Sequence, residues 1–177
     1  RKDFGAASAR AGNVIGGGDW AEDRIIPDCI RALEAGKPIV LRNPDATRPW
    51  QHVLDPLNGY LTLAAAVAKN PEIFRGAWNF GPDVGAGLTV GDLGERAVKY
   101  WGGGTVEVER PKDTPFEHRL LQLNIDKAKL ELDWRPKWNS ERAIEESIDW
   151  YKKVIGGKTG WDVSRAQIKA FEDATGD

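Results

Sequence analysis

Apolar side chains recur at helical spacing in several segments of the chain. Between residues 25 and 35 they alternate with polar positions every three or four residues, and Gly36 suits the C-terminal end of a helix. The same spacing predicts further helices, and residues suited to capping mark where they start: Asp55 followed by Pro56, Thr89, Asp126, Ser140, and Ser164 in a capping box with Gln167.

Short apolar runs between these helices predict strands. Residues 6–15 are small and apolar and end in Gly16-Gly17-Gly18, which predicts a buried strand that runs into a glycine loop. Further strands are expected at residues 38–41, 77–80 and 105–109. Strands and helices alternate over the first 80 residues, whereas the chain beyond residue 120 is mainly helical. The fold class is therefore α/β, with too few strands for a free-standing parallel sheet.

Composition narrows the classes of protein. The 177 residues are 41% hydrophobic and 29% charged, which favours one globular domain or part of a larger one. The net charge of −2 comes from interspersed charges, so nucleic acid is not an expected partner. No apolar run is long enough for a membrane span. The single cysteine, Cys29, suits a reducing compartment such as the cytoplasm. The absence of methionine permits a fragment, with N-terminal processing or trimming as the alternative.

Most familiar catalytic motifs are absent. His52 and His118 lie in unrelated segments, and no paired-cysteine or HExxH spacing occurs, so no metal site is expected. The sequence also lacks a P-loop, a G-x-S-x-G elbow, a G-x-G-x-x-G dinucleotide fingerprint and a Tyr-x-x-x-Lys pair.

Three polar side chains are suited to holding an anion. Asn13 lies at the end of the expected buried strand, where ligands of open α/β folds bind, although a local turn bond is the alternative. Arg24 precedes the helix over 25–35 and could meet a phosphate there, or pair with Glu22 or Asp23. Arg48 is restrained by Pro49 and could bind phosphate through two donors, or be a solvated loop arginine.

The eight tryptophans are interpreted mainly as core. Four lie toward the C-terminus, where aromatic residues at helical spacing usually pack inside: Trp134, Trp138, Trp150 and Trp161. Trp20, in the glycine loop, is expected to be more exposed and could line a pocket.

Several motifs together resemble a known family. Residues 10–20, Arg-Ala-Gly-Asn-Val-Ile-Gly-Gly-Gly-Asp-Trp, and the following Asp23-Arg-Ile-Ile-Pro-Asp28 resemble the C-terminal half of the CDP-glucose 4,6-dehydratases. These are extended short-chain dehydrogenases/reductases. Ile15 and Gly17 replace the tyrosine and proline that are usual in the superfamily. Further matches follow in order along the chain: residues 36–41, 47–55, 78–82, 132–136 (with Asp133 in place of glycine), 148–152 and 167–168.

This resemblance implies a fold and a division of the chain. It implies the C-terminal portion of an extended short-chain dehydrogenase/reductase, without its Rossmann nucleotide-binding part. Residues 1–20 would form the last Rossmann-type strand and the glycine loop, and residues 21–177 the sugar-nucleotide-binding region. The family's NAD, its glycine fingerprint and its catalytic Tyr-x-x-x-Lys pair would all belong to a missing N-terminal part.

The resemblance also implies a reaction and its partners. NAD oxidises CDP-glucose at C4, water leaves across C5 and C6, and the hydride returns to C6. This chain would contribute substrate contacts from Asn13, Arg24, Arg48, Asn79 and Arg119. We expect the parent to be cytoplasmic and homo-oligomeric, and the fragment alone to be inactive. The alternatives are another nucleotide-sugar epimerase or dehydratase, or a non-enzymatic binding module without a cofactor domain.

Overall fold

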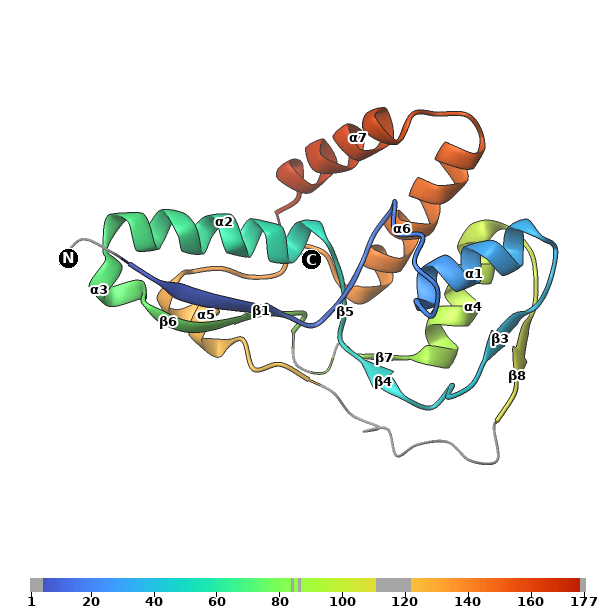
Figure 1. Cartoon of the computed structure of the whole chain (residues 1–177), viewed down its shortest axis with the longest axis horizontal. Coiled ribbons are helices and arrows are strands. Elements are labelled where there is room, and N and C mark those ends of the chain that lie inside the picture. Colours follow the sequence, from blue (N-terminus) through green and yellow to red (C-terminus); the bar gives the residue numbers. More distant parts are fainter. Residues whose placement is uncertain (1–4, 84, 86, 111–121, 176–177) are drawn as a thin grey trace.

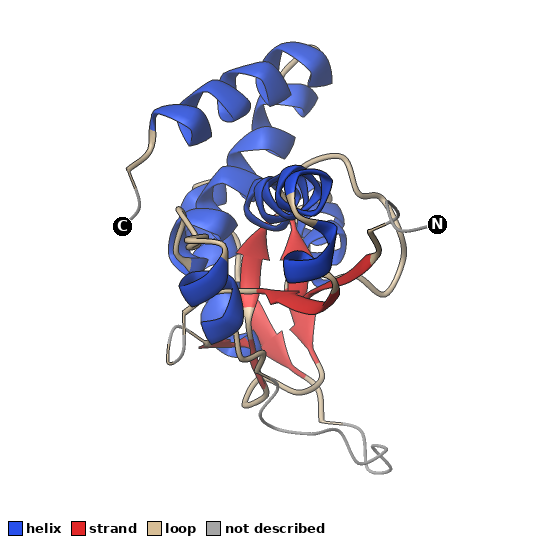
Figure 2. Cartoon of the chain, turned by 90° about the vertical axis from the view of Figure 1, so that its left-hand side faces the viewer, coloured by secondary structure: helices blue, strands red, loops and turns tan. Residues whose placement is uncertain are grey.

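The computed structural model describes residues 5–83, 85, 87–110 and 122–175, and it has an α/β fold (Figure 1). Seven helices are described: α1 (Ile25–Glu34), α2 (Leu54–Lys69), α3 (Pro71–Phe74), α4 (Val90–Trp101), α5 (Asp126–Glu131), α6 (Ser140–Ile155) and α7 (Gly160–Asp173). Most of them lie on one side of the strands, as Figure 2 shows end-on. The expected class, α/β with few strands and a mainly helical remainder, is confirmed.

The described strands form four two-stranded sheets. Three pairs are parallel: β1 (Ala7–Ala11) with β6 (Gly76–Phe80), β2 (Asn13–Ile15) with β5 (Trp50–His52), and β3 (Ile39–Leu41) with β8 (Val106–Val108). The fourth pair, β4 (Thr47–Arg48) with β7 (Leu88–Thr89), is antiparallel. Every parallel pair joins strands that are distant in sequence, with helices in the intervening chain.

The strand expected over residues 6–15 differs from the prediction in two ways. Gly12 interrupts it: β1 ends at Ala11, and β2 begins at Asn13. Positions 7–10 are exposed, so the prediction of a buried strand is wrong for β1. Within the described residues β6 is the only strand paired with β1, so one edge of β1 stays open. Burial of a parallel strand requires neighbours on both edges and both faces.

Two hydrophobic clusters hold the fold. The larger one packs α1, β3, α4 and α6 together and includes Cys29, Ile30, Leu93, Ile144 and Ile148, none of them exposed by more than 1%. The smaller cluster joins α2, β6 and α5. In Figure 1 α2, β6 and α5 of the smaller cluster lie at one end of the molecule and α1, β3 and α4 of the larger cluster at the other, with α6 of the larger cluster nearer the middle.

Tryptophans contribute to both clusters. Of the four C-terminal tryptophans that were expected in the core, three are buried. Trp134, Trp138 and Trp150 are buried. Trp161 is 71% exposed, so its assignment to the core is wrong. It lies in the first turn of α7 and stacks loosely with Arg165 on the surface of that helix.

One predicted helix cap is confirmed. Thr89 accepts a hydrogen bond from the backbone N–H of Asp92, and the Asp92 carboxylate accepts one from the Thr89 backbone N–H. This capping box satisfies two backbone donors at the start of α4. The Thr89 hydroxyl and the Thr89 backbone N–H both donate to the Asp92 carboxylate and lower its pKa, because they favour the charged form.

The caps expected at Ser140 and Ser164 are wrong. Asn139 caps α6 instead, and the Ser140 hydroxyl donates to the Trp50 carbonyl oxygen at 2.8 Å. Thr159 caps α7, while Ser164 lies inside that helix and accepts from the Trp150 indole at 3.0 Å. In both cases the serine hydroxyl binds another element, so sequence position alone misplaced the cap.

The caps expected at Asp55 and Asp126 are also wrong, since both residues lie within the first turn of their helices. Val53 is the N-cap of α2 and Ile125 that of α5. Asp55 is turned inward, and its Oδ1 accepts from the Lys137 backbone N–H at 2.7 Å. Gln167, expected in the capping box with Ser164, donates instead to the Glu146 carbonyl oxygen.

The glycine loop after β2 packs tightly against α6. A Cβ placed on Gly17 would lie 2.0 Å from Cδ2 of the Trp150 indole, well inside any allowed contact. Gly17 is therefore required by close packing rather than by backbone conformation. This explains why the usual proline of the superfamily motif is absent here.

We expect Gly17→Ala to destabilise the fold by about 1–3 kcal/mol, because the added methyl must displace the Trp150 ring. Urea unfolding measures this change in free energy. Gly160→Ala is the matched control, since its Cβ would lie 3.1 Å from Cζ2 of the same indole and needs only a small shift. Equal effects of the two substitutions would contradict the packing argument.

Candidate functional site

The predicted site residues Asn13 and Arg48 lie on two adjacent segments. Asn13 begins β2 and is directly opposite Trp50 of β5 in the parallel register. A Cβ placed on Gly12 would lie 3.2 Å from Pro49, so the chain neighbours of Asn13 and Arg48 are in contact. The structure therefore brings these two segments side by side, although the prediction itself concerned each residue alone.

Gln51 links this junction to the β1–β6 pair. Its side chain is fully buried, and its Nε2 donates to the Phe80 carbonyl oxygen at 3.0 Å. Asn79 immediately precedes Phe80 in β6. Sequence reasoning did not select Gln51, and a glutamine between Trp50 and His52 carries no local signal of burial.

Arg48 is a buried strand residue. It lies in β4, only 8% exposed, and its Nη1 donates to the Thr47 carbonyl oxygen at 2.9 Å. The alternative of a solvated loop arginine is therefore wrong. A buried guanidinium held in an extended strand has a fixed direction, which suits two-donor recognition of a phosphate.

The two candidate asparagines differ in their contacts. Asn13 is half-buried, and within the described part of the chain its side chain makes no hydrogen bond, so the alternative of a local turn bond is not realised. Asn79 donates from Nδ2 to the Asn124 carbonyl oxygen at 3.0 Å. Its amide therefore already connects β6 to the segment before α5, which is a structural role.

Arg24 lies apart from the Asn13–Arg48 junction. It is exposed and occupies the N-cap position of α1 in an extended conformation, without a side-chain capping bond. Among the described residues it forms no ion pair with Glu22 or Asp23, so that alternative is not realised. No described contact connects it to Asn13 or Arg48. Arg119 and His118 lie outside the described residues.

Buried polar groups gather where β5 turns into α2. His52 is 1% exposed and Asp55 fully buried, and the His52 ring packs on Trp138 with 4.8 Å between centroids. His52 Nδ1 accepts weakly from the Leu54 backbone N–H, at 3.4 Å. Within the described chain, His52 Nε2 and Asp55 Oδ2 have no hydrogen-bond partner. Unpartnered buried polar atoms are costly, so this corner contributes unfavourably to stability.

Burial shifts both pKa values toward the neutral forms. It raises the pKa of Asp55 to about 6, although backbone hydrogen bonds from Lys137 and Trp138 favour the charged carboxylate. It lowers the pKa of His52 to about 4. The Cys29 thiol, buried in the larger cluster, has its pKa raised to about 12 and is therefore unsuited to act as a nucleophile.

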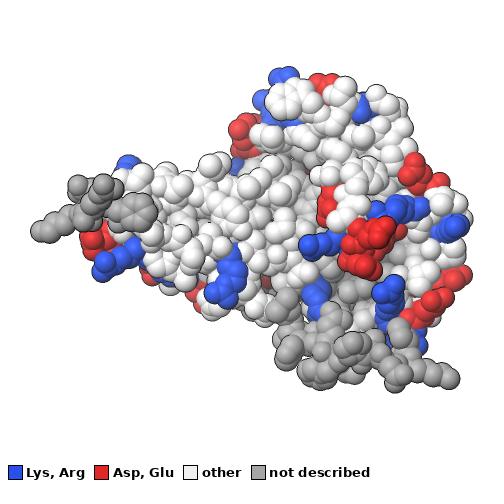
Figure 3. Space-filling view, in the orientation of Figure 1, with Lys and Arg blue, Asp and Glu red and all other residues white. Residues whose placement is uncertain are grey.

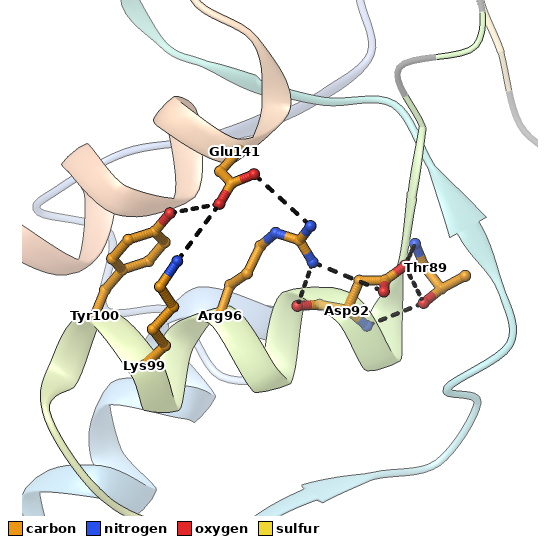
Figure 4. A network of polar contacts seen from close by, with 6 residues as sticks. All are labelled: Thr89, Asp92, Arg96, Lys99, Tyr100 and Glu141. Carbon is orange, nitrogen blue, oxygen red and sulfur yellow. Dashed lines mark hydrogen bonds and ion pairs between the residues drawn. The ribbon is translucent and has the colours of Figure 1, made fainter.

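A polar network on the other side of α6 fixes α4 in place (Figure 4). The Tyr100 hydroxyl donates to Glu141 Oε1 at 2.9 Å, and Arg96 and Lys99 approach the same carboxylate at 3.8 Å. Burial and Glu141 raise the pKa of Tyr100 to about 12. The charged groups pair with one another, although the buried Arg96 Nε has no hydrogen-bond partner among the described residues, so we interpret the network as an interhelical brace rather than a reaction centre.

An apolar groove of about 540 Å³ lies between β1 and α2. Small and aliphatic residues line it, including Ala7, Ala9 and Val67, and no charged side chain is among them. The surface over this end of the molecule is correspondingly poor in charge on the face seen in Figure 3. A groove of this chemistry does not suit the diphosphate of a nucleotide.

The described residues do not fit NAD. Gly16, Gly17 and Gly18 were the nearest approach to a dinucleotide loop, but Gly17 lies against the Trp150 indole, where a pyrophosphate would have to approach. The structure thus offers no dinucleotide cradle in the described chain. In the same residues no group of three or more His, Cys, Asp or Glu is placed to hold a metal, and no helix is long and apolar enough to cross a membrane.

Comparison with known proteins identifies the class. No protein-family model matches the sequence. The fold matches UDP-glucuronic acid 4-epimerase from Bacillus cereus, solved with UDP-glucuronic acid and NAD, with a TM-score of 0.69 at 19% identity over 84% of this chain and 45% of that one. It also matches dTDP-glucose 4,6-dehydratase from Bacillus anthracis, solved with NAD, with a TM-score of 0.63 at 22% identity over 82% of this chain and 44% of that one.

The chain thus has the fold of these epimerases and dehydratases, which are extended short-chain dehydrogenases/reductases. Its sequence is 39% identical to CDP-glucose 4,6-dehydratase from Salmonella typhimurium over 171 residues. That match covers 97% of this chain and 48% of the Salmonella enzyme, so the chain spans about half the length of this relative. The resemblance stated from the motifs is confirmed.

The opposite shifts of His52 and Asp55 predict an unusual pH dependence. Asp55, with its folded pKa raised from 3.8, contributes stability below pH 3.8 that is lost as pH rises through 6. His52, with its folded pKa lowered from 6.5, contributes stability above pH 6.5 that is lost as pH falls through 4. Each effect is on the order of 3 kcal/mol, so the two largely offset each other.

Removing one of the two groups should reveal the pH dependence of stability that the other contributes. Asp55→Asn keeps an oxygen acceptor for the Lys137 N–H and leaves His52 alone, so stability should fall as pH drops from 6.5 to 4. His52→Gln leaves Asp55 alone, so stability should fall as pH rises from 4 to 6. Urea unfolding across this range measures both. Profiles parallel to the wild type in both variants would rule out the offset.

Proposed function

We propose that the chain is the sugar-nucleotide-binding part of a CDP-glucose 4,6-dehydratase. The observation that carries the proposal is the 39% identity over 97% of the chain, which includes the motif around Asn13 and the motif around Arg48. The contact between the Gly12–Asn13 and Arg48–Pro49 segments supports it, because one ligand can then meet both side chains.

In this proposal the candidate residues contact different parts of the nucleotide sugar. Arg48, buried and fixed in β4, would pair with the diphosphate, while Asn13 would bond a diphosphate or sugar oxygen. Arg24 would meet the nucleotide at the N-terminus of α1, where the helix dipole also favours an anion. Asn79 and Arg119 are the weaker members of the set, since the Asn79 amide is engaged with Asn124.

The whole protein would convert CDP-glucose to CDP-4-keto-6-deoxy-glucose. NAD, if held by the whole protein, would supply the acceptor and donor of hydride that such an internal redox conversion requires, so the loss of one water would be redox-neutral overall. NAD would be held by residues other than those described, since the glycine loop offers no cradle for it. A cytoplasmic, homo-oligomeric enzyme is part of the same proposal, and this stretch alone is expected to be inactive.

A second candidate is another epimerase or dehydratase of the same family. The observation in its favour is that structures of UDP-sugar epimerases share the fold. A third candidate, a binding module without catalysis, is favoured by the lack of a dinucleotide cradle in the described residues.

Assay of the natural full-length protein with CDP-, UDP-, GDP- and dTDP-glucose separates these candidates. We expect a product lighter by one water from CDP-glucose, detected by mass spectrometry. Epimerised product from UDP-glucose would favour the second candidate. Binding of a nucleotide sugar without any turnover in the presence of NAD would favour the third.

Arg48→Ala should weaken binding of CDP-glucose by about 1.5–3 kcal/mol, the loss of one charge-assisted contact. That corresponds to a rise in Kd of roughly 10- to 150-fold, measurable by calorimetry. Arg135→Ala is the matched control, because Arg135 is exposed and pairs only with Asp133 in its own turn. Unchanged affinity in Arg48→Ala, with the fold intact, removes Arg48 from the site.

A further inference from the structure

Trp20 is an exposed aromatic side chain on a firmly held loop. It lies between β2 and α1 and is 48% exposed. Its ring meets the Tyr151 ring of α6 in a T-shaped contact, with 5.0 Å between centroids and 85° between planes. This contact fixes the orientation of the indole while leaving much of its surface open to solvent.

Backbone contacts hold the loop on both sides of Trp20. Arg31 of α1 donates to the carbonyl oxygens of Trp20 and Ala21, both at 3.1 Å. The Tyr151 hydroxyl donates to the Asp19 carbonyl oxygen, and Asp19 Oδ1 accepts from the Ala21 backbone N–H at 3.0 Å. The position of Trp20 is thus set before any ligand arrives, which reduces the entropy that binding must overcome.

The loop occupies the place where ligands of open α/β folds bind. It follows the carboxyl end of β2, whose first residue is Asn13, and it ends at Arg24 at the start of α1. Asp19, Glu22 and Asp23 of this loop are acidic and exposed, whereas its basic residue, Arg24, lies at the far end, and Arg31 is already engaged with Asp28 and with the backbone oxygens of Trp20 and Ala21. A phosphate therefore suits the Arg24 end of the loop, and an uncharged part of the ligand suits the indole.

We propose that Trp20 is a stacking platform for an uncharged ring of the nucleotide sugar, and that Tyr151 is its positioning residue. The inference rests on the proposed function, because it assumes a nucleotide-sugar ligand. Two parts of such a ligand could stack on the indole, because both present an apolar ring face: the base and the C–H face of the sugar. Arg48 would bind the diphosphate in the middle of the ligand, and Trp20 would contact the base or the sugar at one of its ends.

Protection of Trp20 from acrylamide quenching tests this contact directly. Of the eight tryptophans, Trp20 and Trp161 are the exposed ones, at 48% and 71%. In full-length Trp161→Phe protein, saturating CDP-glucose should reduce the quenching of fluorescence by acrylamide. Trp20→Phe protein, which keeps Trp161, is the matched control and should show no reduction.

Two ligands distinguish the source of the ring. Protection by CDP alone assigns the base, whereas protection by CDP-glucose but not by CDP assigns the sugar. Ligand binding measured by calorimetry without any protection of Trp20 overturns the inference and leaves the proposed function standing. If calorimetry detects no nucleotide or nucleotide sugar bound to the wild type, the proposed function fails and the inference fails with it.

Substitutions test the energetic role of the pair. Trp20→Ala should raise Kd for the protecting ligand roughly 5- to 150-fold, the range of one lost stacking contact, while Trp20→Phe should retain most of the affinity. Tyr151→Phe removes the hydrogen bond to Asp19 and should raise Kd in the wild type but not further in Trp20→Ala. Fully additive effects would show that Tyr151 does not act through Trp20, and matched urea midpoints exclude a folding defect.

Discussion

Burial of the inner face of α6 is the interaction on which the other elements depend. Ile144, Ile148 and Tyr151 of this helix are fully buried, and Trp150 lies against the glycine loop. Ser140 at its first turn binds β5, and Glu141 anchors the brace from α4. A helix near the C-terminus therefore sets the position of a loop near the N-terminus, and this loop carries Trp20.

The proposed binding residues are distributed around this helix rather than along it. Asn13 lies on β2, which pairs with β5, and Arg48 lies on β4, which precedes β5 in the chain. Buried Gln51 of β5 ties the β2–β5 pair to β6. The buried corner of His52 and Asp55 follows directly, at the start of α2. Burial of this corner shifts the pKa values of His52 and Asp55 in opposite directions.

Local signals succeeded where the relevant contacts are local. The helix over residues 25–35, which the structure shows as Ile25–Glu34, and the cap at Thr89 were predicted, since both depend on residues within a few positions of one another. Strands β4 and β5 were missed because they have two and three residues and Pro49 separates them. Arg48 was thus taken for a loop residue, although the choice of Arg48 itself came from its motif.

Sequence alone was sufficient for the resemblance and for the α/β class, because motifs and periodicity are properties of neighbouring residues. Only the tertiary structure showed that Ser140 and Ser164 bind other elements instead of capping helices, that Trp161 is exposed, and that Gly17 is pressed against Trp150. Each of these outcomes depends on a partner distant in sequence, and such a partner is defined only once the helices and strands have packed.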